Sequence, residues 1–213
     1  MRRRTFVAAI ATGTVGTAGC LGFVTGDEAY EQEASPARVD DATLDSTGYS
    51  LDEAYEDRID REFEVAGRSR TVRATNQVAR YHRGIDLPLL ETVEAAVFAV
   101  VATPAFEIAG QTLNPVGEMD NAELAEMVQD EYEELAVDDE VATSSVGTLG
   151  DEMRLSQFEG TAVFGAVDLD IYVHVGTVRS GNDFVVAVGV SPRQFPDEAA
   201  VVRELVDGLV HEI

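Results

Sequence analysis

Residues 167–175 read VDLDIYVHV, and this stretch decides the fold. Apolar and polar side chains alternate along it, which is the pattern of a β-strand with one buried and one exposed face. The turn sequence SGND at 180–183 then leads into the valine-rich stretch 184–190, so the two segments predict a β-hairpin. We expect the apolar residues of the first strand to face the core and its polar residues to face solvent.

More strands and two helices follow from the same kind of pattern. Asp120 and Glu123 form a capping-box start for one helix, and a second helix is predicted from Pro196 to the end of the chain. Periodicity predicts four further strands, at 59–65, 71–81, 95–108 and 154–164. The sequence therefore predicts an α+β fold, with a single antiparallel sheet of about six strands and two main helices packed on it, the second of which is the C-terminal helix.

The charge of the chain limits its partners. The 213 residues carry 40 acids and 15 bases, a formal net charge of −25, and every base is arginine. Such a chain is a poor ligand for nucleic acid, whose binding depends on Lys and Arg against phosphate. A dispersed acidic surface without lysine is typical of a halophilic protein, because molar salt screens self-repulsion over about 3 Å.

The first twenty residues have the order of a signal peptide. Arg3 and Arg4 lie in a basic start that resembles the twin-arginine export motif, and a weakly apolar stretch follows. Residues 17–20, TAGC, resemble a lipobox that ends at Cys20, the single cysteine. We therefore expect cleavage before Cys20, lipid on its thiol, and a location on the outer face of the cytoplasmic membrane.

The rest of the chain shows no break in composition. We expect three parts: a twin-arginine signal peptide at 1–19, a lipidated cysteine and tether at 20–35, and a single α+β domain at 36–213.

Three segments carry a family resemblance. They are the leader RRRTFVAAIATGTVGTAGCLGF, the stretch AAVFAVVATPAFEIAGQTLNPVGEMDNAELAEMVQDEY, and FEGTAVFGAVDLDIYVHVGTVRSGNDFVVAVGV. With them the chain resembles a family of uncharacterised haloarchaeal lipoproteins exported by the twin-arginine route. The order of strands and helices is loosely similar to PsbP-like domains. Neither resemblance implies a chemistry or a functional residue.

One strand face holds groups that can bind metal. Asp168, Asp170 and His174 lie on the polar side of the strand at 167–175. Neighbours two residues apart on a strand are separated by about 6.6 Å, which is wide for one ion. The favoured interpretation is a solvated polar face, and the alternative is a metal site.

Arginine is concentrated in one predicted hairpin. Residues 58–83 hold seven arginines against three acids, whereas residues 118–140 hold eleven acids and no base. One hypothesis is an anion-binding surface at Arg70, Arg73 and Arg80. The interpretation we favour is that these arginines pair with the protein's own carboxylates.

No catalytic motif accompanies these features. The sequence lacks HExxH, GxSxG, a P-loop and a GxGxxG followed by a helix. It names no catalytic residue, cofactor or metal. The expected function is a lipid-anchored binding or interaction module of the cell envelope, with an envelope protein or a small ligand as partner. The alternatives are a metal-assisted hydrolase that uses the 168–174 strand face and an accessory subunit of a membrane complex.

Overall fold

Among the described residues, the main sheet has eight strands. The computed structural model describes residues 29–65, 68–85, 93–105, 107–108, 111–112, 114–132, 135–164 and 167–212. The strands run in the order β1-β4-β5-β11-β10-β9-β8, with β3 also paired to β4. Their bounds are β1 Tyr30–Glu33, β3 Ser50–Val65, β4 Arg68–Ile85, β5 Val93–Pro104, β8 Leu135–Thr148, β9 Asp151–Phe164, β10 Val167–Ser180 and β11 Asp183–Pro192.

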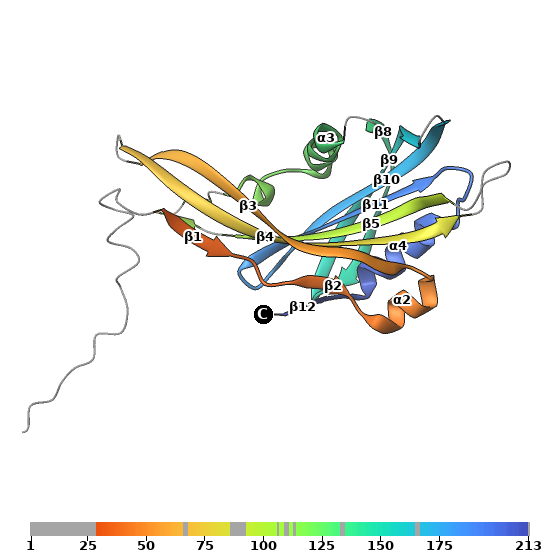
Figure 1. Cartoon of the computed structure of the whole chain (residues 1–213), viewed down its shortest axis with the longest axis horizontal. Coiled ribbons are helices and arrows are strands. Elements are labelled where there is room, and N and C mark those ends of the chain that lie inside the picture. Colours follow the sequence, from red (N-terminus) through yellow and green to blue (C-terminus); the bar gives the residue numbers. More distant parts are fainter. Residues whose placement is uncertain are drawn as a thin grey trace, which may run out of the picture. The chain divides into compact units, whose positions relative to one another are not determined.

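Smaller elements accompany this sheet (Figure 1). Two short two-stranded sheets pair β2 with β12 and β6 with β7. The helices of the described residues are α2, α3, α4 and one 3-10 turn, η1. The bounds are β2 Ala37–Val39, α2 Asp41–Thr47, β6 Glu107–Ile108, β7 Gln111–Thr112, η1 Pro115–Gly117, α3 Asn121–Glu131, α4 Glu198–Asp207 and β12 Leu209–His211.

The chain divides into two compact units. One comprises Met1–Glu31 and Asp60–Arg73, and the other comprises Gln32–Ile59 and Ala74–Ile213. The described part of the first unit includes the end of β3, at 60–65, and the beginning of β4, at 68–73. The second unit contains all four helical elements and the site considered below.

The predicted hairpin between β10 and β11 is confirmed. The two strands are antiparallel and close at the pair Ser180–Asp183. Gly181 in the turn has φ 59°, a left-handed value that glycine adopts without steric cost. Ile171, Val173 and Val175 are fully buried, as their alternation predicts.

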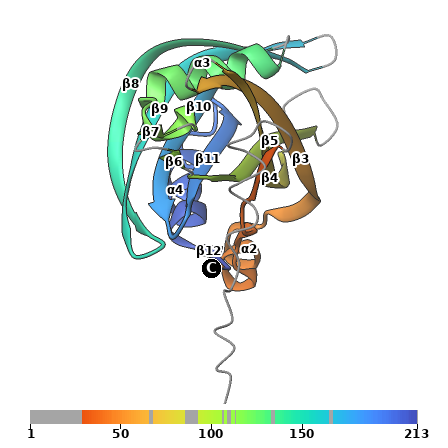
Figure 2. The same cartoon turned by 90° about the vertical axis from the view of Figure 1, so that its left-hand side faces the viewer.

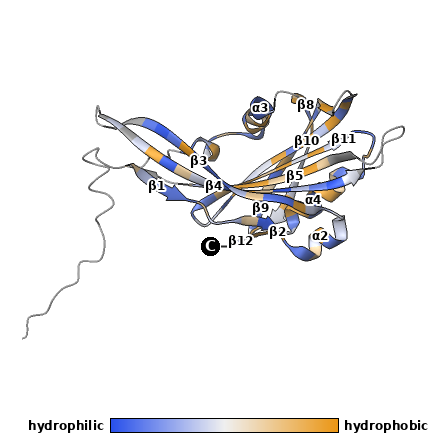
Figure 3. Ribbon diagram, in the orientation of Figure 1, coloured by the Kyte–Doolittle hydropathy of each residue, from blue (hydrophilic) through white to orange (hydrophobic). Residues whose placement is uncertain are grey.

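Both faces of the sheet are covered in the second unit. On one face, β5, β9 and β11 pack with α4, β2 and β12 around Phe98, Leu155 and Leu205. On the other face, α3 and η1 pack on β9, β10 and β11 around Leu124, Phe158 and Ile171. Figure 3 shows that hydrophobic residues, in orange, dominate β5 and the neighbouring central strands.

The expected α+β fold with one sheet of about six strands is wrong. The structure is mostly strand, with an eight-stranded sheet, two small sheets at β2–β12 and β6–β7, and three α-helices among its described residues. The two strands that the prediction lacks are β1, which falls in the expected tether, and β8, whose acidic residues at 138–140 interrupt its alternation. Figure 2 shows the long β8 at the edge of the sheet.

The expected C-terminal helix is also shorter than predicted. It ends at Asp207, and β12 then pairs with β2. Gly208 lies at this point because a Cβ there would come within 2.2 Å of Thr43 Oγ1 on α2. A glycine after the last helical turn is a common stop signal.

Candidate functional site

His174 lies in the middle of β10, beneath α4. Its partners across the sheet are Gln157 on β9 and Gly189 on β11. Only 3% of the residue is exposed. The expectation that this face of the strand is solvated is therefore wrong at His174, because the sheet is covered on both sides.

A small cavity lies against the imidazole ring. Its volume is about 80 Å³, and α4 contributes Ala199 and Arg203 to its wall. The lining residues are Ala142, Thr143, Ser144, Leu155, Gln157, His174, Ala199 and Arg203. They include one permanent cation and no carboxylate, although the chain as a whole carries a net charge of −25.

The ring of His174 has no hydrogen-bond partner among the residues that the structure describes. Both Nδ1 and Nε2 are buried and unpaired. Burial, and secondarily the positive charge of Arg203, lowers the pKa of His174 to about 4, so the ring is neutral at pH 7. A buried polar atom without a partner costs about 1–3 kcal/mol. A buried, unpaired polar atom beside a cavity indicates a position where a water molecule or a ligand binds.

Asp168 and Asp170 do not join His174 in a metal site. Both carboxylates are on exposed residues, whereas His174 is buried. Within the described ranges no group of three His, Cys, Asp or Glu residues could hold a metal ion. Strand geometry places the three on one face, but α4 covers only one end of it.

A second, larger hollow lies on the α3 side of the sheet. Its volume is about 190 Å³, and its walls are almost entirely apolar. The lining comes from β4, β5, α3, β8, β9 and β11, and comprises Arg80, Val97, Ala99, Val128, Tyr132, Leu135, Ala162, Val163, Val188 and Val190. We call this hollow the α3 groove. Tyr132 and Val163 are 49% and 37% exposed, so apolar surface remains in water here.

The arginines of the β3–β4 hairpin are mostly paired within the chain, as we favoured. Arg73 donates to both carboxylate oxygens of Asp60, at 2.7 and 3.0 Å, and to Glu31 at 2.7 Å. Arg80 contacts Glu53 at 2.9 Å and Asp52 at 3.9 Å. The side chain of Arg70 lies outside the described part of the structure. Arg73 and Arg80 therefore already have carboxylate partners in the places where an anion would bind.

Arg83 forms the most buried of these pairs. Its guanidinium contacts Glu198, which is 3% exposed, and also donates to the carbonyl of Thr47 at 3.1 Å. The Tyr49 hydroxyl donates to Glu198 at 3.3 Å. Burial raises the pKa of Tyr49 to about 12, against the opposing charge of Arg83. This cluster fixes α4 to β4 and α2, and sequence spacing gave no sign of it.

His211 lies in another buried network. Its Nδ1 is 3.0 Å from Ser180 Oγ, and its Nε2 is 3.2 Å from both Asp183 Oδ2 and the Ser35 carbonyl. Asp183 also accepts from the Ser35 N–H at 2.9 Å. The set has the residue types of a catalytic triad, but Ser180 and Asp183 are only 7% and 5% exposed. The network ties β12, the β10–β11 turn and the segment before β2 together.

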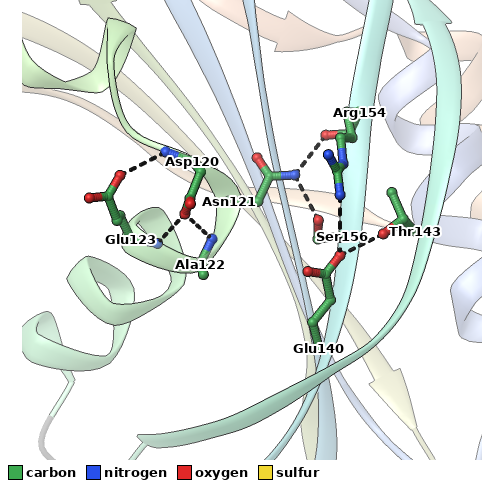
Figure 4. A network of polar contacts seen from close by, with 8 residues as sticks. All are labelled: Asp120, Asn121, Ala122, Glu123, Glu140, Thr143, Arg154 and Ser156. Carbon is green, nitrogen blue, oxygen red and sulfur yellow. Dashed lines mark hydrogen bonds and ion pairs between the residues drawn. The ribbon is translucent and has the colours of Figure 1, made fainter.

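The polar contacts at the start of α3 are also structural (Figure 4). Asp120 caps the helix through the backbone N–H groups of Ala122 and Glu123, and Glu123 accepts from the Asp120 N–H in return. The capping box predicted from the sequence is thus confirmed. Asn121 donates to the Arg154 carbonyl and to Ser156, which attaches α3 to β9.

Some expected features lie outside the described residues. They are Cys20, Arg3 and Arg4, together with the rest of the leader. In the part of the chain that the structure describes, no helix is both long and apolar enough to span a bilayer.

The fold and these hollows define a mostly β domain that carries the α3 groove and a smaller cavity beside His174. Residues 36–210 match a protein family, and the chain belongs to that family, described as Domain of unknown function (DUF6517). No curated protein matches the chain.

Solved structures give a distant likeness. Cyanobacterial PsbP (CyanoP) from Synechocystis sp. PCC 6803, a solution structure, is 11% identical with a TM-score of 0.40. The match covers 94% of this chain and 96% of that one.

Proposed function

We propose that this protein is a lipid-anchored binding module on the outer face of the cytoplasmic membrane of a halophile, and that it binds an apolar small molecule in the α3 groove. The observation that carries the proposal is the groove itself, an apolar hollow of about 190 Å³ in a strongly acidic chain. Small-molecule sites are concave and mostly apolar, with few polar groups.

The walls of the groove favour an uncharged or weakly polar ligand. Val97 and Ala99 of β5 and Val188 and Val190 of β11 form much of its lining. Arg80 is the single charged residue of the lining, and Glu53 and Asp52 already neutralise it. The hydroxyl of Tyr132 remains as a polar group at an exposed edge.

Binding rests on burial of apolar area. Each Å² of apolar surface removed from water contributes about 25 cal/mol. The exposed ring of Tyr132 and the exposed side chain of Val163 offer apolar area that a ligand would cover.

The anchor and its location rest on the leader. The basic start with Arg3 and Arg4 supports twin-arginine export, and TAGC supports lipid on Cys20. Each buried methylene of a lipid contributes about 0.8 kcal/mol to membrane attachment, so two acyl chains would hold the domain firmly.

A filled-groove variant tests the binding. Ala99→Phe places a ring in the groove, and Val141→Phe adds the same ring at an exposed position on β8 outside the groove. The full chain is purified from membranes at native salt, extracted with organic solvent, and the extract analysed by mass spectrometry. Lipid on Cys20 stays covalently attached and does not enter the extract.

We expect one apolar compound to co-purify with wild type and with Val141→Phe, and to fall at least tenfold in Ala99→Phe. Equal amounts from both variants, or none from wild type, would contradict the groove as a binding site.

A second experiment tests the anchor separately. Cys20→Ser removes the thiol, so we expect the exported protein to leave the membrane fraction or to remain unprocessed. Unchanged membrane partitioning of an exported Cys20→Ser chain would refute the lipid anchor.

Metal-assisted hydrolysis gains no support from the site, since Asp168 and Asp170 are exposed and His174 is buried.

An accessory role in a membrane complex is supported by one observation, the exposure of Tyr132 and Val163 at the α3 groove. In that case the groove would cover an apolar segment of a partner, and the extract above would hold no small compound.

A further inference from the structure

We propose that the cavity beside His174 binds one small anion, of the size of chloride, bromide or nitrate, between Arg203 and the imidazole N–H. This site is separate from the α3 groove and does not depend on what the groove binds. It is formed by α4, β8, β9 and β10.

The charge of the cavity points to an anion. Arg203 is the one permanently charged residue in its wall. The arginines of the chain with a described carboxylate partner include Arg38, Arg58, Arg73, Arg80, Arg83, Arg154 and Arg193. Arg203 has no such partner among the residues the structure describes. A guanidinium beside a cavity without carboxylates is the place where an acidic protein can hold a negative ion.

The polar groups in the wall are suited to donate hydrogen bonds. The neutral ring of His174 carries one N–H, and neither of its nitrogens has a partner. Ser144 and Gln157 offer a hydroxyl and an amide NH₂. Thr143 contributes no donor, since its hydroxyl already donates to Glu140 at 2.5 Å.

The size of the cavity restricts the ion. Its volume of about 80 Å³ is well above the ~10–15 Å³ that a single water molecule requires. It is far below the range of about 300–1,000 Å³ of sites for drug-sized ligands. Leu155 and His174 form a buried floor, whereas Thr143 and Arg203 are exposed, so an ion reaches the floor past the guanidinium.

The position of the cavity gives the ion a structural effect. Arg203 belongs to α4 and His174 to β10, so an anion between them connects the helix to the sheet. The contact of α4 with the sheet is close, because a Cβ on Gly189 would lie 3.0 Å from both methyl carbons of Val202 and 3.6 Å from the Cβ of His174. A ligand that binds only the folded state stabilises it by mass action.

Bromide titration of the full chain tests the proposal. The chain is held at constant molar ionic strength, with gluconate as an anion too large for the cavity, and bromide replaces gluconate stepwise. We follow the melting temperature and the ring ¹⁵N signals of His174. The variants are Arg203→Gln, His174→Phe, and Arg179→Gln as a control that removes the same charge at an exposed position on β10.

We expect a saturable rise in melting temperature and a saturable shift of the His174 ring signals in wild type and in Arg179→Gln. Arg203→Gln should lower the apparent affinity for bromide at least tenfold, and His174→Phe should weaken it as well. Anomalous scattering from a crystal grown in bromide should place the ion between Arg203 and His174.

Three results would overturn the proposal. The first is a bromide response without saturation. The second is an equal response in Arg203→Gln and Arg179→Gln. The third is a crystal in bromide whose cavity holds water alone.

Discussion

His174 and His211 are both buried, and their surroundings differ completely. Both ring nitrogens of His211 contact partners, on Ser180, Asp183 and Ser35. Neither ring nitrogen of His174 does. The two rings are equally hidden from solvent, with a 1% exposed side chain at His211 and a 3% exposed residue at His174. Burial alone therefore does not separate a structural histidine from a candidate site, whereas the presence of partners does.

The difference has a topological cause. His211 lies where β12 meets the β10–β11 turn and the segment that precedes β2, so the side chains of Ser180 and Asp183 and the backbone carbonyl of Ser35 supply polar groups. His174 lies in the centre of a strand, where backbone groups bond to neighbouring strands. Its side chain can find a partner only on a side chain of a neighbouring strand, on α4, or on a bound molecule.

The largest effect should follow from the network of His211. Asp183→Ala removes the carboxylate that contacts the buried His211 ring and that accepts from the Ser35 N–H, so the Ser35 N–H loses its acceptor and the His211 ring keeps only Ser180 and the Ser35 carbonyl. We expect the free energy of unfolding to fall by about 3–5 kcal/mol. Urea denaturation at fixed molar salt measures it, with Asp168→Ala at an exposed position of β10 as the control. A loss no larger than in the control would show that this network is not structural.

The second-largest effect should be the contribution of His174 to the pH dependence of the free energy of unfolding. Its pKa is about 4 in the folded protein against 6.5 in the unfolded chain, so the unfolded chain binds a proton first as the pH falls. Stability from this residue is complete above pH 6.5 and is lost as the pH falls from 6.5 to 4, by about 3 kcal/mol. The carboxylates titrate in the same range, so the measurement is the difference between wild type and His174→Phe.

In His174→Phe the part of the pH dependence that comes from the ring should be absent. Identical losses of unfolding free energy in both chains between pH 6.5 and 4 would show that the ring stays accessible to protons in the folded state.

The substitution Ser180→Ala should leave one ring nitrogen of His211 without a partner, as both ring nitrogens of His174 are. The substitution removes the partner of Nδ1, at 3.0 Å, and leaves that nitrogen buried and unpaired. We expect a loss of about 1–2 kcal/mol in the free energy of unfolding. Calorimetry at molar salt measures it, and Ser46→Ala on the exposed face of α2 is the matched control. A loss equal to the control would mean that an unpaired ring nitrogen costs little in this protein.

Local features of this fold could be predicted from the sequence. The α3 cap needs only Asp120 and Glu123, and the β10–β11 turn needs only residues 180–183. Both depend on groups a few residues apart. Sequence alternation does not predict β8, because the acidic stretch at 138–140 follows its first three residues and its pairing with β9 shifts register between Val137 and Glu140 and again before Ala142. Those shifts interrupt the alternation on which strand prediction depends.

The candidate site could not be predicted in the same way. Alternation correctly places Asp168, Asp170 and His174 on one face of β10, but it does not show which part of that face is covered. The covering helix, α4, lies more than twenty residues further along the chain. The cavity depends on Arg203 meeting strand residues through tertiary packing, which no local pattern records. In contrast, Gly208 is a local stop signal for α4, although periodicity alone extends that helix to the end of the chain.

The smallest expected effect separates the two histidines most sharply. Replacing His211 or its partners removes hydrogen bonds, whereas His174→Phe removes two buried nitrogens that have none. An apolar ring of similar size takes away the desolvation cost and keeps the packing under α4. In gluconate, where the cavity has no ion to hold, we expect the free energy of unfolding at pH 7 to rise by about 1 kcal/mol. In molar bromide the gain should shrink or reverse, since the wild-type ring then has its partner.

Urea denaturation of both chains in both salts measures the four values, and Tyr172→Phe, on the same strand, controls for the general effect of the salts. A loss of stability in gluconate would mean that the ring already has a partner there, and the contrast between the two histidines would then fail.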